Sequence, residues 1–381
     1  MVRSVPARSL HVLHLVVAGD IGGAERLLVD LARRPGGTRA RHTVALFTPN
    51  RALAAWLVES GLRVRDRGPV RENPVAYLWR TFGPADLRWL LQIMAEEKPD
   101  LLHLHTFQSH VLGVRAAKRA GIPSVRTEHH VDYYDDPSRA PFTRWAARRT
   151  DLTVAISDYV ARVVTEKEPS LGARMVTIRN GVDVGYFSPN AGAETLGASA
   201  DRRFVVSCRL EPWKQVHLAI AAIALVPNAT LTIVGNGSER LALEKLATEL
   251  SVAARVTFAG YHRDPRPFLH EADVAIACSK DEPLGLSVLE TLAVGRPVIG
   301  FDGGGLPEII ANNVTGWLVT DRTASGLARA MTAACDLEAS SLRTMGAEAR
   351  RSAVETFSVD KMAVAYGNAY ERALAPLRPA N

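Results

Sequence analysis

The chain has 381 residues, of which 47% are hydrophobic and 23% charged; these values are ordinary for a globular protein, and the length favours two domains over one. No apolar run reaches the roughly 18 residues of a membrane-spanning helix, and neither a zinc-ligand spacing nor a basic helix with interleaved aromatics indicates a nucleic-acid partner. The net charge of +6 is uneven, because residues 1–190 hold 27 Lys and Arg against 19 Asp and Glu, whereas the remainder holds 19 against 21. A basic first half suits an anionic membrane surface or an anionic ligand, although an arginine-rich solvated surface is an equal alternative.

The N-terminal segment and the cysteines indicate a compartment. His11 and His14 interrupt the apolar segment near the start, so no signal peptide is expected. Cys208, Cys278 and Cys335 are scattered and odd in number, which favours reduced thiols over a disulfide framework. We therefore expect a cytoplasmic protein, and the basic first half leaves open a peripheral attachment to the inner face of the cell membrane.

Strands alternate with helices through the first half. Apolar and β-branched runs predict the strands, and helical periodicity with caps predicts the helices. The expected strands are 10–17, 43–48, 100–105, 124–129, 151–157 and 175–179, and the expected helices are 24–33, 53–60, 75–98 with a break at Gly83-Pro84, 144–149 and 158–165. This rhythm predicts a parallel sheet, whose ligands sit at the carboxyl ends of the strands.

A glycine-containing loop follows the first strand. Gly22 and Gly23 are paired, and paired glycines let the backbone approach a ligand closely. The spacing is not the Gly-x-Gly-x-x-Gly of dinucleotide sites, and a plain tight turn is the alternative. Glu25 is either a first-turn residue favoured by the helix dipole or a ligand contact.

Histidines gather at the ends of two strands. His103 and His105 are two residues apart and share one face of a strand, so a metal pair is conceivable. No third ligand is near in the sequence, and satisfied core or strand-end histidines are favoured; His105, at the strand end, could border a ligand pocket. His129 and His130 end the next strand, and a neutral imidazole there can donate one hydrogen bond to a sugar hydroxyl.

A segment rich in Ala, Gly and Ser, residues 190–202, precedes a second series of strands and helices. The expected strands are 204–209, 229–235, 256–261, 272–278, 298–301 and 313–319, and the expected helices are 239–250, 285–294, 324–334, 342–355 and 359–373. The sequence Gly235-x-Gly237-x-x-Arg240 lacks the third glycine of the dinucleotide fingerprint, which disfavours a nicotinamide dehydrogenase.

The polar loop after the fourth of these strands, and the helix that follows it, organise the second half. The amides of Gly285, Leu286 and Ser287 would lie at the positive end of the helix dipole, which suits a pyrophosphate. Glu282 and Glu290 bracket the helix start, and Glu290 can face the loop and accept a bidentate hydrogen bond from a sugar diol. An exposed loop glutamate and a helix-surface glutamate are the alternative.

Two loop cations, Arg209 and Lys214, are five residues apart after the first strand of the second half. Arginine offers a planar fork and lysine a point charge, and both suit a diphosphate. Together they could neutralise a diphosphate without a metal, and no Asp-x-Asp metal signature is present, since Asp135 and Asp136 are adjacent. Solvated loop cations are the alternative.

Six segments together resemble glycosyltransferase family 4, the retaining, group 1 type of the GT-B fold. They are Gly22-Gly-Ala-Glu25, Thr127-Glu-His129, Arg179-Asn-Gly-Val-Asp183, the pair Arg209 and Lys214, the run from Glu282 to Glu290, and Gly303-Gly-Gly-Leu-Pro-Glu308. Their order and spacing fit the family from residue 10 to about residue 370, and they are specific for fold and reaction type rather than for the sugar.

The resemblance implies an α/β protein with two facing Rossmann-like domains. An acceptor-binding domain would occupy 1–188, a nucleotide-sugar-binding domain 200–358, and a C-terminal helix within 359–381 would pack back on the first domain. The implied reaction moves a sugar from a nucleotide-diphosphate sugar to a glycan, lipid-linked or small-molecule acceptor in bacterial polysaccharide or glycoconjugate synthesis. It retains the anomeric configuration and needs no metal or cofactor. A non-catalytic partner subunit of this fold, or another nucleotide-sugar enzyme such as a 2-epimerase, is the alternative.

The resemblance also implies a role for each candidate residue. On the donor side, Glu290 holds the ribose, Tyr261 frames the base, and the diphosphate contacts are Arg209, Lys214, Gly23 and the amides of Gly285, Leu286 and Ser287. Glu282 contacts sugar hydroxyls and His129 reaches the sugar near its anomeric carbon, so the expected catalytic residues are His129, Glu282, Arg209 and Lys214. The acceptor side is Gly22, Glu25, His105 and His130, and His130 is also the alternative to His129 at the sugar.

Overall fold

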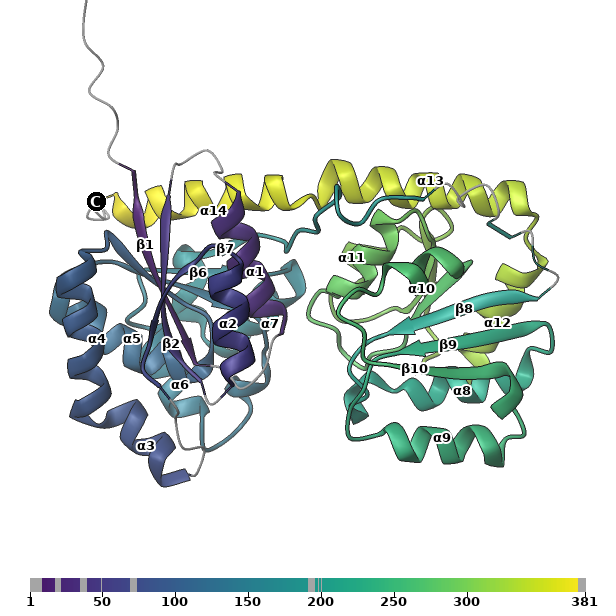
Figure 1. Ribbon diagram of the computed structural model, residues 1–381, viewed down its shortest axis with the longest axis horizontal. Coiled ribbons are helices and arrows are strands. Elements are labelled where there is room, and N and C mark those ends of the chain that lie inside the picture. Colours follow the sequence, from purple (N-terminus) through teal and green to yellow (C-terminus); the bar gives the residue numbers. More distant parts are fainter. Residues whose placement is uncertain are drawn as a thin grey trace, which may run out of the picture. The chain divides into compact units, whose positions relative to one another are not determined.

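The computed structural model describes residues 9–17, 22–34, 40–48, 50–68, 74–190, 196–197, 199 and 201–375, without the side chains of residues 74–77. The chain divides into two compact units. The first contains the described residues up to Asn180 together with those from Val359, and the second runs from Gly181 to Ser358. Each unit is a parallel sheet with helices on both faces, which confirms the predicted α/β class (Figure 1).

The first unit is built on a seven-stranded sheet in the order β3-β2-β1-β4-β5-β6-β7. Every neighbouring pair is parallel, as the alternation of strands and helices predicts. The strands are β1 (His11–Val17), β2 (Arg41–Phe47), β3 (Arg63–Asp66), β4 (Leu101–Leu104), β5 (Ser124–Glu128), β6 (Leu152–Ala155) and β7 (Met175–Thr177).

Helices cover both faces of this sheet. The helices are α1 (Gly23–Arg33), α2 (Arg51–Glu59), α3 (Pro74–Phe82), α4 (Pro84–Glu97), α5 (Phe107–Ala120), α6 (Ala140–Ala147), α7 (Asp158–Lys167) and α14 (Val359–Leu374). Apolar side chains of α4 and α5 pack on one face of the central strands, and those of α1, α2 and α14 pack on the other. The C-terminal helix α14 thus belongs to the first unit, where Tyr366 and Tyr370 are buried.

Strand β3 was not predicted from the sequence. Three of its four residues are charged, and Arg63 and Arg65 both form ion pairs with the buried carboxylate of Glu97 on α4. A short, charged strand is typical of a sheet edge, where it discourages pairing with another chain.

The second unit is built on a six-stranded parallel sheet in the order β10-β9-β8-β11-β12-β13. Its strands are β8 (Arg202–Ser207), β9 (Ala229–Val234), β10 (Val256–Gly260), β11 (Val274–Ala277), β12 (Val298–Phe301) and β13 (Gly316–Val319). Its helices are α8 (Val216–Leu225), α9 (Arg240–Glu249), α10 (Arg266–Glu271), α11 (Leu286–Ala293), α12 (Ala324–Asp336) and α13 (Ala339–Thr356).

The change from the first unit to the second occurs at Asn180, eight residues before the boundary expected at 188. Hydrogen bonds explain the difference, because the segment after Asn180 is held by side chains of the second unit. Arg350 donates to the carbonyl oxygens of Val184 and Phe187 at 2.9 and 2.8 Å, and His270 contacts the carbonyl oxygen of Ser188 at 2.9 Å. Within the expected linker, residues 191–195, 198 and 200 lie outside the described residues.

None of the helices in the described ranges is both long enough and apolar enough to cross a membrane.

Candidate active site

The strongest candidate site lies where β11 leads into α11 in the second unit. α11 begins at Leu286, and Gly285 before it has a left-handed backbone, φ 103°, which favours glycine. The first amides of an α-helix have no acceptor within the helix. Those of Leu286 and Ser287 are therefore suited to an anion at the carboxyl edge of the sheet.

A short ion pair lies in the loop before this helix. Lys214 Nζ donates to Glu282 Oε2 at 2.6 Å, and Ser279 Oγ donates to the same oxygen at 2.6 Å. The two charged side chains are only 12% and 13% exposed, and the ammonium also lies 3.9 Å from the centre of the Trp213 ring. The ion pair thus connects Lys214, which is expected at the diphosphate, with Glu282, which is expected at the sugar.

A small cavity connects the ion pair to the helix. It measures about 20 Å³ and is lined, among others, by Cys208, Lys214, Ser279, Glu282, Ser287 and Thr291. This volume admits about one water molecule, so a larger ligand could reach only the atoms at its mouth. Glu290, expected at the ribose, lies one turn into α11 and is 7% exposed.

Cys208 lines the same cavity as Lys214 and Glu282. Arg209 is exposed just after β8, and the neighbouring Cys208 is partly buried. Burial raises the pKa of the Cys208 thiol to about 11, and the charges of Lys214, Glu282 and Arg209 also act on it. A thiol that stays protonated at neutral pH is a poor nucleophile, so Cys208 is a structural residue here.

Neighbouring loops support the residues of the site. A Cβ on Gly304, whose φ is 62°, would come within 2.4 Å of the Glu282 carbonyl oxygen, and the Gly305 amide donates to that oxygen at 2.7 Å. From the sequence, the three glycines indicate only that a backbone can approach closely; the structure identifies the Glu282 loop as the partner. The Asn236 carbonyl likewise accepts from the Leu210 amide at 2.9 Å, beside Arg209.

Tyr261, expected to frame the base, follows β10 and is 67% exposed. Its ring is therefore accessible to a ligand on the second unit. This position is compatible with stacking on a base, and the role stays a prediction.

In the first unit, the glycine loop is described only from Gly22, and residues 18–21 lie outside the described residues. Glu25 is 4% exposed, and its Oε2 accepts a hydrogen bond from the Gly22 amide at 2.8 Å. The carboxylate therefore caps the start of α1, which begins at Gly23. Of the two roles expected for Glu25, the first-turn role has this contact, and the acceptor contact stays a prediction.

The structure brings His105 and His129 together at the ends of β4 and β5. Their rings are stacked with centroids 6.0 Å apart, and the residues are only 3% and 8% exposed. Among the described residues, His105 Nδ1 and His129 Nε2 have no hydrogen-bond partner. The neighbouring His130 lies instead with its ring 6.5 Å from that of Tyr133.

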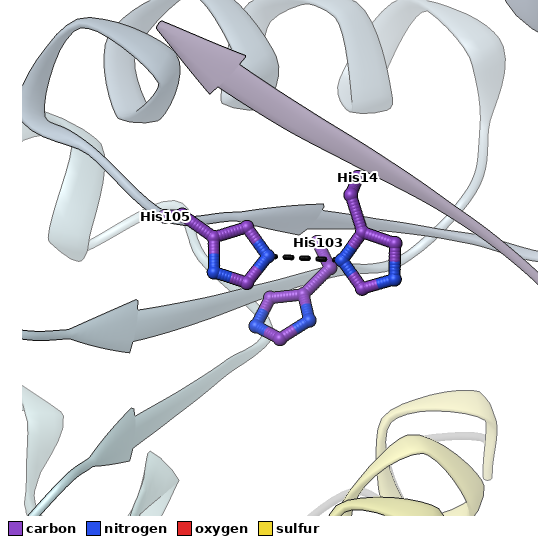
Figure 2. A group of neighbouring side chains, drawn as sticks. All are labelled: His14, His103 and His105. Atoms are coloured by element: carbon purple, nitrogen blue, oxygen red, sulfur yellow. Dashed lines mark hydrogen bonds between the residues drawn. The ribbon is translucent and has the colours of Figure 1, made fainter. Parts of the chain in front are cut away.

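A third buried histidine, His14 on β1, completes a cluster with His103 and His105 (Figure 2). Parallel pairing places His14 directly opposite His103, and His14 Nδ1 lies 2.9 Å from His105 Nε2. The sequence shows no third ligand near the pair because 89 residues separate His14 from His103. The prediction that no third possible metal ligand lies near His103 and His105 is therefore wrong, because the fold places His14 beside them.

Hydrogen bonds occupy five of the six ring nitrogens of this cluster, and His105 Nδ1 is the exception. His103 uses Nδ1 for the Tyr370 hydroxyl and Nε2 for the Thr127 hydroxyl, both at 2.8 Å. His14 Nε2 lies 2.8 Å from His42 Nδ1. Burial lowers the pKa of His42 to about 4 and that of His105 to about 3, so both are neutral near neutral pH. The arrangement is a neutral hydrogen-bonded network inside the first unit.

A buried ion pair holds the start of the loop that carries His129. Arg126 donates from Nε and Nη2 to the two carboxylate oxygens of Glu128, at 2.5 and 2.6 Å, and the Tyr134 hydroxyl donates to Glu128 at 2.8 Å. Both charged side chains are at most 2% exposed. Sequence reasoning missed this pair, although the alternation of Arg126 and Glu128 along one strand face is a readable signal.

The two α/β units have the GT-B fold. The structure resembles that of Anabaena Alr3699/HepE, solved in complex with UDP, with a TM-score of 0.82 and 24% identity over 95% of this chain and 100% of that one. It also resembles a sucrose-phosphate synthase from Thermosynechococcus elongatus, with a TM-score of 0.80 and 21% identity over 96% of this chain and 99% of that one.

The chain belongs to glycosyltransferase family 4. A family model described as Glycosyltransferase Family 4 matches residues 21–186, and a second model, described as Glycosyl transferases group 1, matches residues 193–352. The lipopolysaccharide core biosynthesis glycosyltransferase LpsE of Rhizobium meliloti is 30% identical, with 82% of this chain and 85% of that protein covered. A glycogen synthase of Mycobacterium tuberculosis is 28% identical, with 94% and 89% covered. The protein is thus a nucleotide-sugar glycosyltransferase.

Proposed function

We propose that this enzyme moves a sugar from a nucleotide-diphosphate sugar to a glycan, lipid-linked or small-molecule acceptor in bacterial polysaccharide or glycoconjugate synthesis. The transfer retains the anomeric configuration and uses neither a metal nor a cofactor. The observation that carries the proposal is the convergence of Lys214, Glu282 and the first amides of α11 at the carboxyl edge of the second sheet.

On this proposal the second unit holds the donor. Lys214 and Arg209 neutralise the diphosphate, whose charge grows as the bond to the sugar breaks, and the amides of Leu286 and Ser287 add neutral donors. Glu290 accepts hydrogen bonds from the ribose diol. Such groups are held in place before the donor arrives, so the protein contributes mainly positioning and charge stabilisation.

Residues of each unit, considered separately, are proposed to contact sugar hydroxyls. Glu282 accepts hydrogen bonds from sugar hydroxyls on the donor side. His129 and His105 each offer an unpartnered ring nitrogen among the described residues, and a neutral imidazole can donate to or accept from a hydroxyl. Retention follows if the acceptor attacks on the face that the leaving phosphate vacates and gives its proton to that phosphate, a step that needs no protein base.

The nucleotide is the first identity to establish. UDP and UDP-glucose are bound in solved structures of Anabaena HepE, and this supports a uridine donor as the first candidate. The lipopolysaccharide and glycogen named for the relatives support a glycan or lipid-linked acceptor.

The decisive experiment measures the anomeric configuration of the product. The enzyme is incubated with α-linked sugar nucleotides, a panel of glycan and lipid-linked acceptors, and EDTA, and the product is examined by proton NMR. An α-linked product formed at an undiminished rate in EDTA supports the proposal. A β-linked product would refute retention, and activity that returns only on adding a divalent cation would refute metal independence.

A further inference from the structure

Exposed apolar side chains, all but one of them aromatic, gather on α3 and α6 of the first unit. We call this group the aromatic strip; its members are Leu78, Trp79, Phe82, Phe142 and Trp145, which are 51%, 65%, 39%, 38% and 37% exposed. The chain has six tryptophans, and the two that are exposed among the described residues are both in the strip. Such side chains are usually covered when they cluster, so the strip indicates a surface that meets a partner.

The strip is continuous across the two helices. Trp79 and Phe82 are three residues apart on α3, as are Phe142 and Trp145 on α6, so each pair shares one helix face. The rings of Phe82 and Phe142 are 4.9 Å apart and join the two pairs.

The strip leads directly into a basic cavity. The Arg149 guanidinium lies 4.5 Å from the centre of the Trp145 ring, and Arg149 also lines a cavity of about 560 Å³. Three further cations line the same cavity, namely Lys118, Arg174 and Arg372. Among the described residues that line it, the one carboxylate is that of Asp151, which already accepts two hydrogen bonds from Ser124, at 2.7 and 2.9 Å. The cavity is therefore strongly positive.

We propose that this surface docks the first unit on an anionic lipid bilayer, with the aromatic strip in the interface and the cavity cations on lipid phosphates. Tryptophan and phenylalanine favour the headgroup region, where an apolar ring can be buried while its edge stays near water. Lysine and arginine near an anionic surface each strengthen binding about fivefold, or about 1 kcal/mol. Two such signals together give the stable attachment that either gives weakly alone.

The positive charge of the surface favours an anionic bilayer over a second copy of this chain as its binding partner. An apolar strip alone would suit a second copy of this chain equally well, but four cations beside it would repel the same surface of another copy. An anionic bilayer complements both parts at once. This inference adds to the proposed function, because a lipid-linked acceptor would be presented at such a surface. It rests on the proposed function only in this choice of acceptor.

The test is co-sedimentation of the full chain with vesicles, without donor or acceptor. Phosphatidylcholine vesicles are compared with vesicles that also contain phosphatidylglycerol, at low and at physiological salt. We expect binding to the anionic vesicles that weakens with salt. The double variant Trp79→Ser/Trp145→Ser should bind at least tenfold more weakly, and Lys118→Gln/Arg372→Gln about 25-fold more weakly, since each cation accounts for about fivefold.

Matched controls come from the second unit. Leu241 on α9 is 80% exposed, and the Lys245 side chain on the same helix is 78% exposed. Leu241→Ser and Lys245→Gln should sediment with vesicles as the wild type does. All variants change exposed residues, and an unchanged melting temperature confirms that each is folded.

Four outcomes would overturn the inference. The wild type could stay in the supernatant with anionic vesicles at low salt, or the Trp79→Ser/Trp145→Ser variant could bind as tightly as the controls. Saturable binding of inorganic phosphate without vesicle binding would assign the cavity to a soluble anion. Self-association that this variant abolishes, without vesicle binding, would assign the strip to a second copy. None of these results bears on sugar transfer, which is measured separately with a soluble acceptor.

Discussion

The substitution Lys214→Met is expected to destabilise the second unit and to slow sugar transfer, for separable reasons. The ammonium and the Glu282 carboxylate are 2.6 Å apart and nearly buried. Opposite unit charges at that distance attract by roughly 6 kcal/mol at an effective dielectric constant of about 20. Desolvation of both groups offsets part of this attraction. Removing one partner of a buried pair nevertheless costs about 3–5 kcal/mol, because the other charge is left unpaired.

The double variant Lys214→Met/Glu282→Gln separates the two effects. With both charges gone, most of the lost free energy of unfolding should return, since neutral replacements of buried pairs are often tolerated. Ser279 keeps an amide oxygen to donate to. Turnover should stay at least tenfold below the wild type, about 1.4 kcal/mol of transition-state stabilisation, because the cation expected at the diphosphate is still missing.

Urea unfolding measures the stability, and release of nucleoside diphosphate from the donor measures turnover. The control is Lys245→Gln, which breaks an exposed pair with Glu249 in the same unit and should change the free energy of unfolding by less than about 0.5 kcal/mol. If the double variant turns over at the wild-type rate, the Lys214–Glu282 pair is structural only and the donor-site assignment fails.

Three further predictions concern other residues. Glu128→Gln leaves the buried Arg126 without its charged partner and should lower the free energy of unfolding, measured in urea, by about 3–5 kcal/mol. The control Arg351→Gln breaks an exposed pair and should change it by less than about 1 kcal/mol. Equal effects of the two substitutions would show that burial does not strengthen the Arg126–Glu128 pair. Burial lowers the folded-state pKa of His42 from 6.5 to about 4, so the unfolded chain takes up its proton first; the stability that His42 contributes is complete above pH 6.5 and should be lost at up to about 1.4 kcal/mol per pH unit down to about pH 4. His42→Gln should reduce the slope of the unfolding free energy against pH in urea titrations at several pH values, and an unchanged slope would count against the burial. Glu290→Gln should weaken nucleotide binding about tenfold, or about 1.4 kcal/mol, by calorimetry; an unchanged affinity would remove Glu290 from the donor site.

The strands other than β3 and most of the helices could be predicted because each is encoded locally, whereas α8 and α10 were not among the expected helices. The helix at α11 ends just before Gly295, and the strands carry continuous apolar runs. Strand β3 was missed because it is short and charged, and what makes it a strand is pairing with β2 and ion pairs to Glu97 on α4. Local patterns do not contain such distant contacts.

The candidate site was predictable in its parts but not in its pairings. Lys214 and Glu282 were each identified from a neighbouring motif, yet their ion pair joins residues 68 positions apart. The histidine cluster depends likewise on the register that sets His14 opposite His103. The Arg126–Glu128 pair was visible in the sequence as two charges on one strand face, but only its burial reveals that it supports the loop after β5.

The second unit is expected to bind a nucleoside diphosphate through its own residues, without a metal. The most direct test is the thermal stability of the full chain with UDP, GDP or ADP, each with and without EDTA. The account predicts that one of these nucleotides, at 100 times its dissociation constant, adds about 2.7 kcal/mol of stability. It also predicts that EDTA changes nothing and that Lys214→Met reduces the gain. Stabilisation by none of the three, or stabilisation that EDTA abolishes, would contradict the claim.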